Sequence, residues 1–410
     1  MPLALHAADS PAHDASAADA FAHFDAIAAA TDLAARLQET AVERDRAGGH
    51  AARERDWIRA SGLLAMSVPR EYGGRGAPWT DIYQTVRIVA RADSALAHLL
   101  GFHHLQVAGL VLYGNAQQQR RLLTETIASN VFWGNALNPL DKRLVATPTA
   151  GGYLLDGIKS FASGSVGADW LTISAWDTLA QAALIAVVPA HQRGIDVRAD
   201  WDAFGQRQTD SGNVHFSGVP LPEADVLQPA GRPGTPQTTL RSQIAQLTMV
   251  NLYLGLAEGA LAAARGYLRD EARPWQAASP EVAAATEDPY VQHRFGQFHL
   301  MVRPAQALAD AAAVALDDAL RRGAGLSAQE RGQVAVAVAE AKVLAHRAAV
   351  DIGSQLFELT GARSTGARFG FDRFWRNARV HTLHDPVDYK LRDLGRYALD
   401  GTLPEPTAYS

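Results

Sequence analysis

The chain has 410 residues, of which 48% are hydrophobic and 20% are charged, so it is long enough to form a soluble protein of two or three domains. Its net charge of -5 and the absence of a basic block exclude a typical nucleic-acid-binding protein. The absence of cysteine excludes disulfide bonds, thiol nucleophiles and cysteine metal ligands, and we expect no metal site. The chain shows no secretory signal pattern and no run of about 18 apolar residues, so we expect a cytoplasmic protein without a membrane span.

The first third of the chain is predicted to be helical. Residues 1–16 are rich in Ala, Asp and Ser and are expected to be disordered, whereas apolar residues at helical spacing predict a helical domain over residues 17–130. Thr80 is expected to cap a strong helix. We expect this helix to continue through Asp93 and to end near His103, so that this histidine faces a pocket.

The hydrophobic period changes at residue 131. Short apolar runs separated by turn residues over 131–236 predict a small antiparallel β-barrel or sandwich. Asp156–Gly157 is the expected turn of a hairpin in this domain. A segment rich in Gly and Pro at 229–236 closes it.

Residues 237–410 are predicted to form a C-terminal helical bundle. Ala- and Leu-rich helices are expected over 287–322, 328–360 and 386–399, and Pro304 is expected to kink or split the first of them. The predicted fold class is therefore α+β, mainly α, in the order helices, β domain, helical bundle.

Residues 355–386 carry the strongest chemical signal. Five arginines lie there among aromatic residues, and the stretch ends in His381-Thr-Leu-His384-Asp385-Pro. Arginine next to glycine is typical of phosphate binding, because guanidinium grips anionic oxygens and glycine lets the backbone approach. The alternative is a surface helix with solvated arginines and hydrogen-bonded histidines, and composition alone does not separate the two.

Five segments resemble the acyl-CoA dehydrogenase superfamily, in that family's order, within a resemblance that extends from about residue 20 to residue 400. They are Val68-Pro-Arg-Glu-Tyr-Gly-Gly, Gly157-Ile-Lys-Ser-Phe-Ala-Ser-Gly, Phe204-Gly-Gln-Arg-Gln-Thr-Asp-Ser-Gly, Arg294-Phe-Gly-Gln and residues 355–363. The resemblance implies the fold of that family and a flavin cofactor. It leaves open whether Arg294 and Gln297 still contact the cofactor.

One departure from the dehydrogenases concerns the catalytic base. They have a Tyr-Glu-Gly-Thr segment after the arginine-rich run, and its glutamate is often the base that removes the α-proton. This chain has His384-Asp385-Pro386-Val387 there, so the carboxylate is one methylene shorter and precedes a proline that favours extended backbone.

The departures resemble the flavin-dependent monooxygenase branch of the superfamily, which includes dibenzothiophene and methanesulfinate monooxygenases. The matching segments are 133–136, 161–164, 207–212, 272–275, 287–290, 371–377 and 381–386. The resemblance implies a two-component enzyme, in which a separate NAD(P)H-dependent flavin reductase supplies FMNH2 by diffusion. Reaction with O2 would give a flavin C4a-hydroperoxide that oxygenates an organosulfur compound (a sulfide, a sulfoxide or an alkanesulfinate). The resemblance also implies a homotetramer.

Three catalytic residues are expected from this resemblance. By motif position, His384 and Ser163 would hold the hydroperoxide and contact the cofactor, and His103 would face the same pocket. A histidine suits the role because it exchanges a proton near neutral pH. The structural alternatives are a core histidine with satisfied ring nitrogens at 103 and a serine that satisfies strand-edge backbone at 163.

Further cofactor-binding residues are implied in the same way. Asn135 and Trp201 would line the isoalloxazine, and Arg273 of an adjacent subunit would bind the FMN phosphate, with Arg373 or Arg376 as helpers. Two other functions stay open: a flavin oxidoreductase of the acyl-CoA dehydrogenase type, and a helical scaffold of the same fold without catalysis. The sequence does not identify the organosulfur substrate, and it does not separate FMN from FAD.

Overall fold

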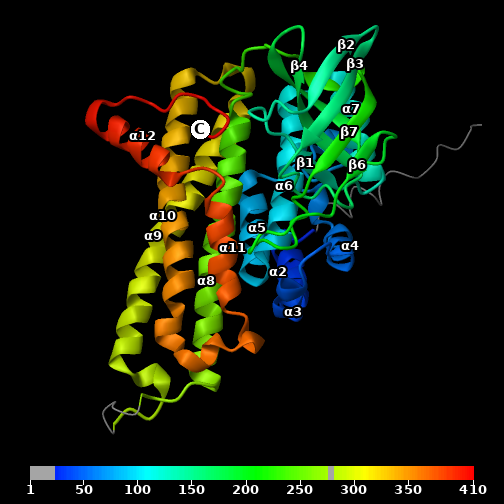
Figure 1. The fold of residues 1–410 in the computed structure, drawn as a ribbon. Helices are drawn as coiled ribbons and strands as arrows, with labels where there is room; N and C mark the ends of the chain where they lie inside the picture. The colour runs from blue at the N-terminus through cyan, green and yellow to red at the C-terminus, as the bar shows by residue number, and fades with distance from the viewer. Residues whose placement is uncertain (1–23, 276–280) are drawn as a thin grey trace, which may run out of the picture.

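The structure is a computed structural model that describes residues 24–275 and 281–410. The predicted disorder of residues 1–16 lies outside the described residues. Figure 1 shows three parts, which are the N-terminal helices, a β domain packed on them, and a bundle of long C-terminal helices. This arrangement confirms the predicted fold class and the order of its parts.

The N-terminal part is helical, as predicted. Its α-helices are α2 (Ala26–Gln38), α3 (Ala41–Ala47), α4 (Ala52–Ala60), α5 (Trp79–Ala92), α6 (Ser94–Tyr113) and α7 (Ala116–Ala128). The expected continuous helix through Asp93 is wrong. Asp93 has an extended backbone (φ -149°), and its carboxylate accepts hydrogen bonds from the amides of Ala95 and Leu96 at 3.0 Å each. Aspartate is a strong N-cap, so it ends α5 and begins α6.

The predicted cap at Thr80 is also wrong. The amides of Trp79 and Thr80 donate to the two carboxylate oxygens of Asp317, at 2.8 Å and 3.1 Å, and Asp317 belongs to α9 (Pro289–Arg322). The unpaired amides at the start of α5 are thus satisfied by a residue more than 230 positions away, which no local pattern can indicate.

The middle domain is one strongly curved sheet. Its strands are β1 (Trp133–Ala136), β2 (Val145–Thr149), β3 (Gly152–Lys159), β4 (Trp170–Asp177), β5 (Ala182–Pro189), β6 (Ile195–Val197), β7 (Val214–Pro222) and β8 (Val226–Gln228). They pair in the order β6-β7-β3-β2-β4-β5-β8, with β1 beside β4.

The expectation of a small antiparallel barrel or sandwich needs correction in two respects. β4 pairs in parallel with both β1 and β2. The ordered path ends at β6 and β8, and these strands are not paired with each other in the described part of the chain. Each has only three residues, which is too short for a ladder that would close the sheet.

The predicted hairpin turn at Asp156–Gly157 lies inside β3 instead. Gly157 has φ +129° and forms a bulge opposite β7, and a Cβ there would lie 2.0 Å from the carbonyl oxygen of Arg143. Glycine is thus used for a bulge rather than for a turn. The β2–β3 hairpin turns at residues 150–151 instead.

The C-terminal bundle contains α8 (Leu240–Asp270), α9, α10 (Ala328–Thr360), α11 (Asp372–Thr382) and α12 (Val387–Asp400). These bounds confirm the three predicted helices to within about two residues at each end, the usual uncertainty of a helix boundary. Pro304 does not split α9, which is assigned as helix on both sides of it.

Two helices form the centre of the molecule. α6 and α8 are long and apolar enough to cross a membrane, but 89% and 83% of their most apolar windows are buried inside the protein. α6 contacts β1, α7 and α8, so it lies between the sheet and the bundle (Figure 1). Burial within the protein explains their apolar composition.

The distant cap of α5 gives a first prediction. Asp317→Ala should lower the free energy of unfolding by about 1–2 kcal/mol, because two helix-end amides lose a charged acceptor. The urea unfolding midpoint measures this. Asp318→Ala is the matched control, since Asp318 is 55% exposed and its one ion pair within the described residues is with Arg321 on the same helix. Equal effects of the two substitutions would contradict the capping role.

Candidate active site

The first part of the site is where β1 meets the loop after β3. The amide of Asn135 donates to the carbonyl oxygen of Ser163 at 2.8 Å, which brings these two predicted residues together. The side-chain Oδ1 of Asn135 is buried and has no hydrogen-bond partner among residues 24–275 and 281–410. A buried acceptor without a partner is costly, so this atom is available to a bound donor.

A chain of hydroxyl groups extends inward from Ser163. Its Oγ lies 2.8 Å from Ser211 Oγ, which in turn lies 2.8 Å from Thr209 Oγ1. Thr209 donates to the carbonyl oxygen of Gln206 at 3.0 Å. Each hydroxyl can donate in one direction and accept from the other, so Ser163 can act either as donor or as acceptor at the open end.

An aromatic pair lies beside this serine. Phe161 has φ +55°, which is unusual for a bulky residue, and its side chain is 70% exposed. Its ring packs edge-on against Trp201, with centroids 5.9 Å apart, and Trp201 Nε1 donates to the carbonyl oxygen of Gln206 at 2.9 Å. An exposed, backbone-strained aromatic residue next to Ser163 is consistent with a binding surface for a planar ring.

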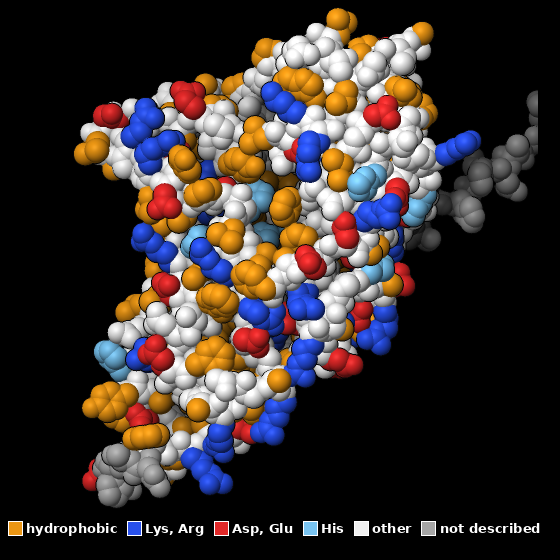
Figure 2. All heavy atoms as spheres, viewed as in Figure 1, with side chains coloured by type: hydrophobic (Ala, Val, Ile, Leu, Met, Phe, Trp, Pro, Cys, Tyr) orange, Lys and Arg blue, Asp and Glu red, His pale blue; other side chains and the backbone are white. Residues whose placement is uncertain are grey.

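α6 connects this loop to α11. A Cβ on Gly164 would lie 3.3 Å from Leu99 on α6, so the loop packs closely on that helix. The adjacent residue, His98, lies with its Nδ1 2.8 Å from Nε2 of His381 on α11. Figure 2 shows histidine and hydrophobic side chains in the furrow between the β domain and the bundle, where these elements meet.

His98 and His381 form a buried neutral pair. Burial lowers the pKa of His98 to about 3 and holds the pKa of His381 well below its ordinary value. His98 Nε2 and His381 Nδ1 have no partner in the described part of the chain. His98 was not predicted from the sequence, because a histidine in an apolar helix gives no local signal that distinguishes it from its neighbours.

The third part of the site follows α11. His384 Nδ1 lies 3.1 Å from Oδ1 of Asp385, and Nζ of Lys342 on α10 lies 2.5 Å from the same oxygen. Burial opposes the charge on Asp385, but the hydrogen bond from His384 and the charge of Lys342 together hold the pKa of its carboxyl well below the usual range. The imidazole of His384 is 43% exposed, whereas Asp385 is buried.

The expectation that His103 lies at the end of a helix is wrong, because this residue lies in the middle of α6. It is completely buried, its Nε2 lies 3.0 Å from the carbonyl oxygen of Leu64, and the amide of Trp133 donates to its Nδ1 at 3.3 Å. Burial lowers the pKa of His103 to about 4. Both ring nitrogens have backbone partners, so the described contacts give His103 a structural role between α6 and β1.

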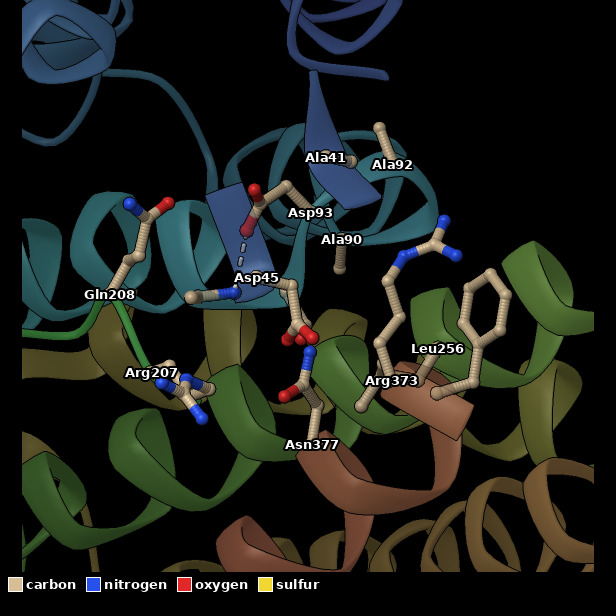
Figure 3. A pocket seen from close by; sticks show the side chains of 13 residues that line it. Ala41, Asp45, Ala90, Ala92, Asp93, Arg207, Gln208, Leu256, Arg373 and Asn377 are labelled. Carbon is tan, nitrogen blue, oxygen red and sulfur yellow. Dashed lines mark hydrogen bonds between the residues drawn. The ribbon is translucent and has the colours of Figure 1, made fainter. Parts of the chain in front are cut away.

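The arginines of α11 contact the N-terminal domain. Arg376 pairs with Asp45 and donates to the carbonyl oxygen of Phe204, and Arg373 is buried beside Asp45 and Asp93. Asp45, Asp93, Arg207 and Arg373 line a small pocket here (Figure 3). Its cavity of about 20 Å³ has room for about one water molecule, and its carboxylates would repel a phosphate. The pocket beside Arg373 therefore does not suit a phosphate, and the helper role of Arg373 and Arg376 in binding the FMN phosphate stays a prediction.

Arg273 lies far from these groups. It is exposed and follows α8 by three residues, and the C-terminal end of α8 lies at the end of the bundle remote from the β domain (Figure 1). It cannot reach Ser163 within one chain, so a role in cofactor binding would require a second copy. Arg294 of α9 pairs with Glu358 of α10, which gives it a partner inside the bundle.

Two family models match the chain. The model described as acyl-CoA dehydrogenase, N-terminal domain, matches residues 26–130, and the model of the C-terminal domain matches residues 247–389. A protein of Pseudomonas putida named "Probable FMNH2-dependent monooxygenase" is 45% identical over 94% of this chain and 97% of its own length. The dibenzothiophene monooxygenase of Rhodococcus qingshengii is 44% identical over 93% of this chain and 95% of its own.

Solved structures agree with these relatives. Methanesulfinate monooxygenase from Pseudomonas fluorescens superposes with a TM-score of 0.92 at 46% identity, over 95% of this chain and 100% of that one. The FMN-bound dibenzothiophene monooxygenase of Paenibacillus sp. A11-2 gives a TM-score of 0.89 at 40% identity, over 94% and 100% of the two chains.

The buried histidine pair gives a second prediction, on pH-dependent stability. The unfolded chain takes up a proton at His98 below pH about 6.5, whereas the folded chain does so only near pH 3, so stability is lost as pH falls through this range. His98→Gln removes this proton uptake and should make the fall shallower by about 1.4 kcal/mol per pH unit.

Urea unfolding between pH 6 and pH 5 measures this difference. His293→Gln, at an exposed position of α9, is the control and should leave the slope unchanged. A slope unaffected by His98→Gln would contradict a neutral, buried His98.

Proposed function

This chain belongs to the acyl-CoA dehydrogenase family, and within it we propose an FMNH2-dependent monooxygenase that transfers one oxygen atom from O2 to an organosulfur compound. Relatives that are 44–46% identical over most of both chains are named for this reaction type and for dibenzothiophene and methanesulfinate. The proposal extends the activities of these relatives to this chain.

One observation carries the proposal. The carboxylate that follows α11, Asp385, is buried and held by Lys342, and the group exposed beside it is the imidazole of His384. A dehydrogenase needs a free carboxylate or another base aimed at the substrate carbon. A carboxylate committed to a buried lysine cannot serve, whereas an exposed imidazole can hold or pass a proton near neutral pH.

The residues of the site fit a reduced flavin. The unpartnered Oδ1 of Asn135 would accept from a ring N–H, and the Ser163 hydroxyl can act as donor or acceptor beside it. The Phe161–Trp201 pair would pack against a planar ring, and His384 would face the reacting side. Bound FMNH2 supplies the activation of O2, and the protein orients the substrate and excludes water.

The remaining features of the system are proposed from the family. Arg273 of a second copy would bind the FMN phosphate, which is consistent with its exposed position remote from Ser163. This requires an oligomer, and we propose a homotetramer. A separate NAD(P)H-dependent reductase would supply FMNH2 by diffusion in the cytoplasm. A reduced sulfur centre suits the reaction, because its lone pair can attack an electrophilic oxygen.

A third prediction concerns flavin binding. Asn135→Ala should weaken binding of FMN about tenfold, because a buried acceptor to the flavin is lost. Titration calorimetry or quenching of flavin fluorescence measures the Kd. Asn138→Ala is the matched control, since the side chain of this nearby asparagine accepts a local hydrogen bond from the amide of Leu140 and its contacts with Lys159 and Asp141 use the backbone carbonyl, which the substitution keeps. A Kd that does not change in Asn135→Ala would remove this residue from the site.

A fourth prediction tests the reaction itself. Protein with chemically reduced FMN, mixed with O2 and methanesulfinate or dibenzothiophene, should give an oxygenated product with little hydrogen peroxide. Ser163→Ala should shift the yield from product to peroxide by tenfold or more, since loss of one such donor commonly costs 10²–10³ in rate. Mass spectrometry and a peroxide assay give both yields.

The dehydrogenase alternative predicts a different outcome. An acyl-CoA substrate would bleach the bound flavin without oxygen, and no oxygenated sulfur product would form. Failure to bind FMN or FMNH2 at all would instead favour a scaffold without catalysis.

A further inference from the structure

We propose that Lys342 is a positioning residue for His384. By balancing the charge of Asp385 inside the bundle, it keeps His384 as the neutral tautomer that donates Nδ1–H to Asp385 and presents a free Nε2 at the open side. The functional meaning of this arrangement rests on the proposed monooxygenase, in which His384 contacts the reacting group.

Lys342 is buried and is held in place by two side-chain hydrogen bonds. Its side chain extends from α10 into the core and is 1% exposed. Its Nζ donates to Asp385 Oδ1 at 2.5 Å and also to the side-chain oxygen of Gln246 on α8. Burial lowers the pKa of Lys342 to about 8, against the attraction of Asp385, so the ammonium form still dominates at neutral pH.

Stability does not explain this pair. Removing two charges from water costs several kcal/mol per ion, and apolar residues of similar volume are often as stable or more stable in such places. Lys342 lies among buried Ala and Val residues of α10 and contacts Gln246 of α8. A charged pair retained in such a core indicates a specific task.

The role of Lys342 follows from the carboxylate oxygen of Asp385 that it shares with His384. Asp385 Oδ1 accepts from both Lys342 and His384, so its charge is already balanced by the lysine. A proton on the other nitrogen of His384 would then add a second cation beside the ammonium. Without Lys342, the buried carboxylate would have His384 as its one cationic hydrogen-bond partner, and the pair would become carboxylate and imidazolium.

Other groups around the pair do not change this balance. The titratable and charged groups from the packed elements are His98 on α6, Tyr253 on α8, His346 on α10, Arg379 and His381 on α11, Lys390 on α12 and Tyr409 in the tail. Burial holds the three histidines neutral and raises the pKa of both tyrosines. The remaining members, Arg379 and Lys390, are cations, which oppose a charge on His384 as Lys342 does.

The experiment measures the protonation of His384 in flavin-free protein. Diethylpyrocarbonate modifies neutral imidazole, and peptide mass spectrometry gives the rate at His384 as a function of pH. Lys342→Met should raise the pH midpoint of this rate by at least one unit, whereas Lys342→Arg should leave it near the wild-type value. In Lys342→Met/Asp385→Asn the rise should disappear, because the buried carboxylate charge is gone.

A folded Lys342→Met protein with an unchanged midpoint would overturn the proposal. If that variant does not fold, Lys342→Gln replaces it. The pH midpoint of His384 modification should rise in the same way, and an unchanged midpoint would again overturn the proposal. The midpoint is measured without flavin or substrate, so this experiment tests the role of Lys342 independently of the monooxygenase activity. In the complete assay, the pH at which product yield gives way to peroxide should shift upward by the same amount in Lys342→Met.

Discussion

The candidate site depends on the burial of α6 between the sheet and the C-terminal bundle. Residues Ser94 to Leu110 of this helix are all buried. One side supports β1 and the loop that carries Ser163, and His98 contacts α11 just before the turn that carries His384. Because the helix is rigid and apolar, it fixes the separation between a hydroxyl group on the β domain and an imidazole on the bundle. The loops that carry these two groups could not by themselves keep the distance between them constant.

Two kinds of buried polar group meet at this junction. The histidines inside α6 and α11 are held neutral by desolvation: His103 has backbone partners at both ring nitrogens, and His98 and His381 share one hydrogen bond. Lys342 and Asp385 are also buried, but they stay charged, since each balances the other. Arg379 and Lys390 add cations near this pair, and His384 is the one imidazole of this group that is substantially exposed. A flavin that must be protected from stray protons would benefit from such surroundings.

The sequence predicted the elements that local patterns determine. The long helices of the bundle and most strands carry their own hydrophobic period, so their positions followed from it. The sequence-based prediction was wrong where a residue far away in the chain determines the local structure. One case is the start of α5, which Asp317 caps, and the other is Gly157, which forms a bulge opposite β7 instead of the expected turn. For the site, motif position pointed to Asn135 and Ser163, and the structure joins these two residues by a backbone hydrogen bond. Motif position could not separate His103 from His98, because both lie in one apolar helix, and it could not show that carboxylates surround Arg373.

The central claim is that this fold transfers an oxygen atom rather than removing hydrogen. Turnover under ¹⁸O2, with chemically reduced FMN and either methanesulfinate or dibenzothiophene, tests it most directly. The account predicts one ¹⁸O atom in the organosulfur product for each oxygen transferred, and none from labelled water. Product without label, or no product together with anaerobic bleaching of the flavin by an acyl-CoA, would contradict it.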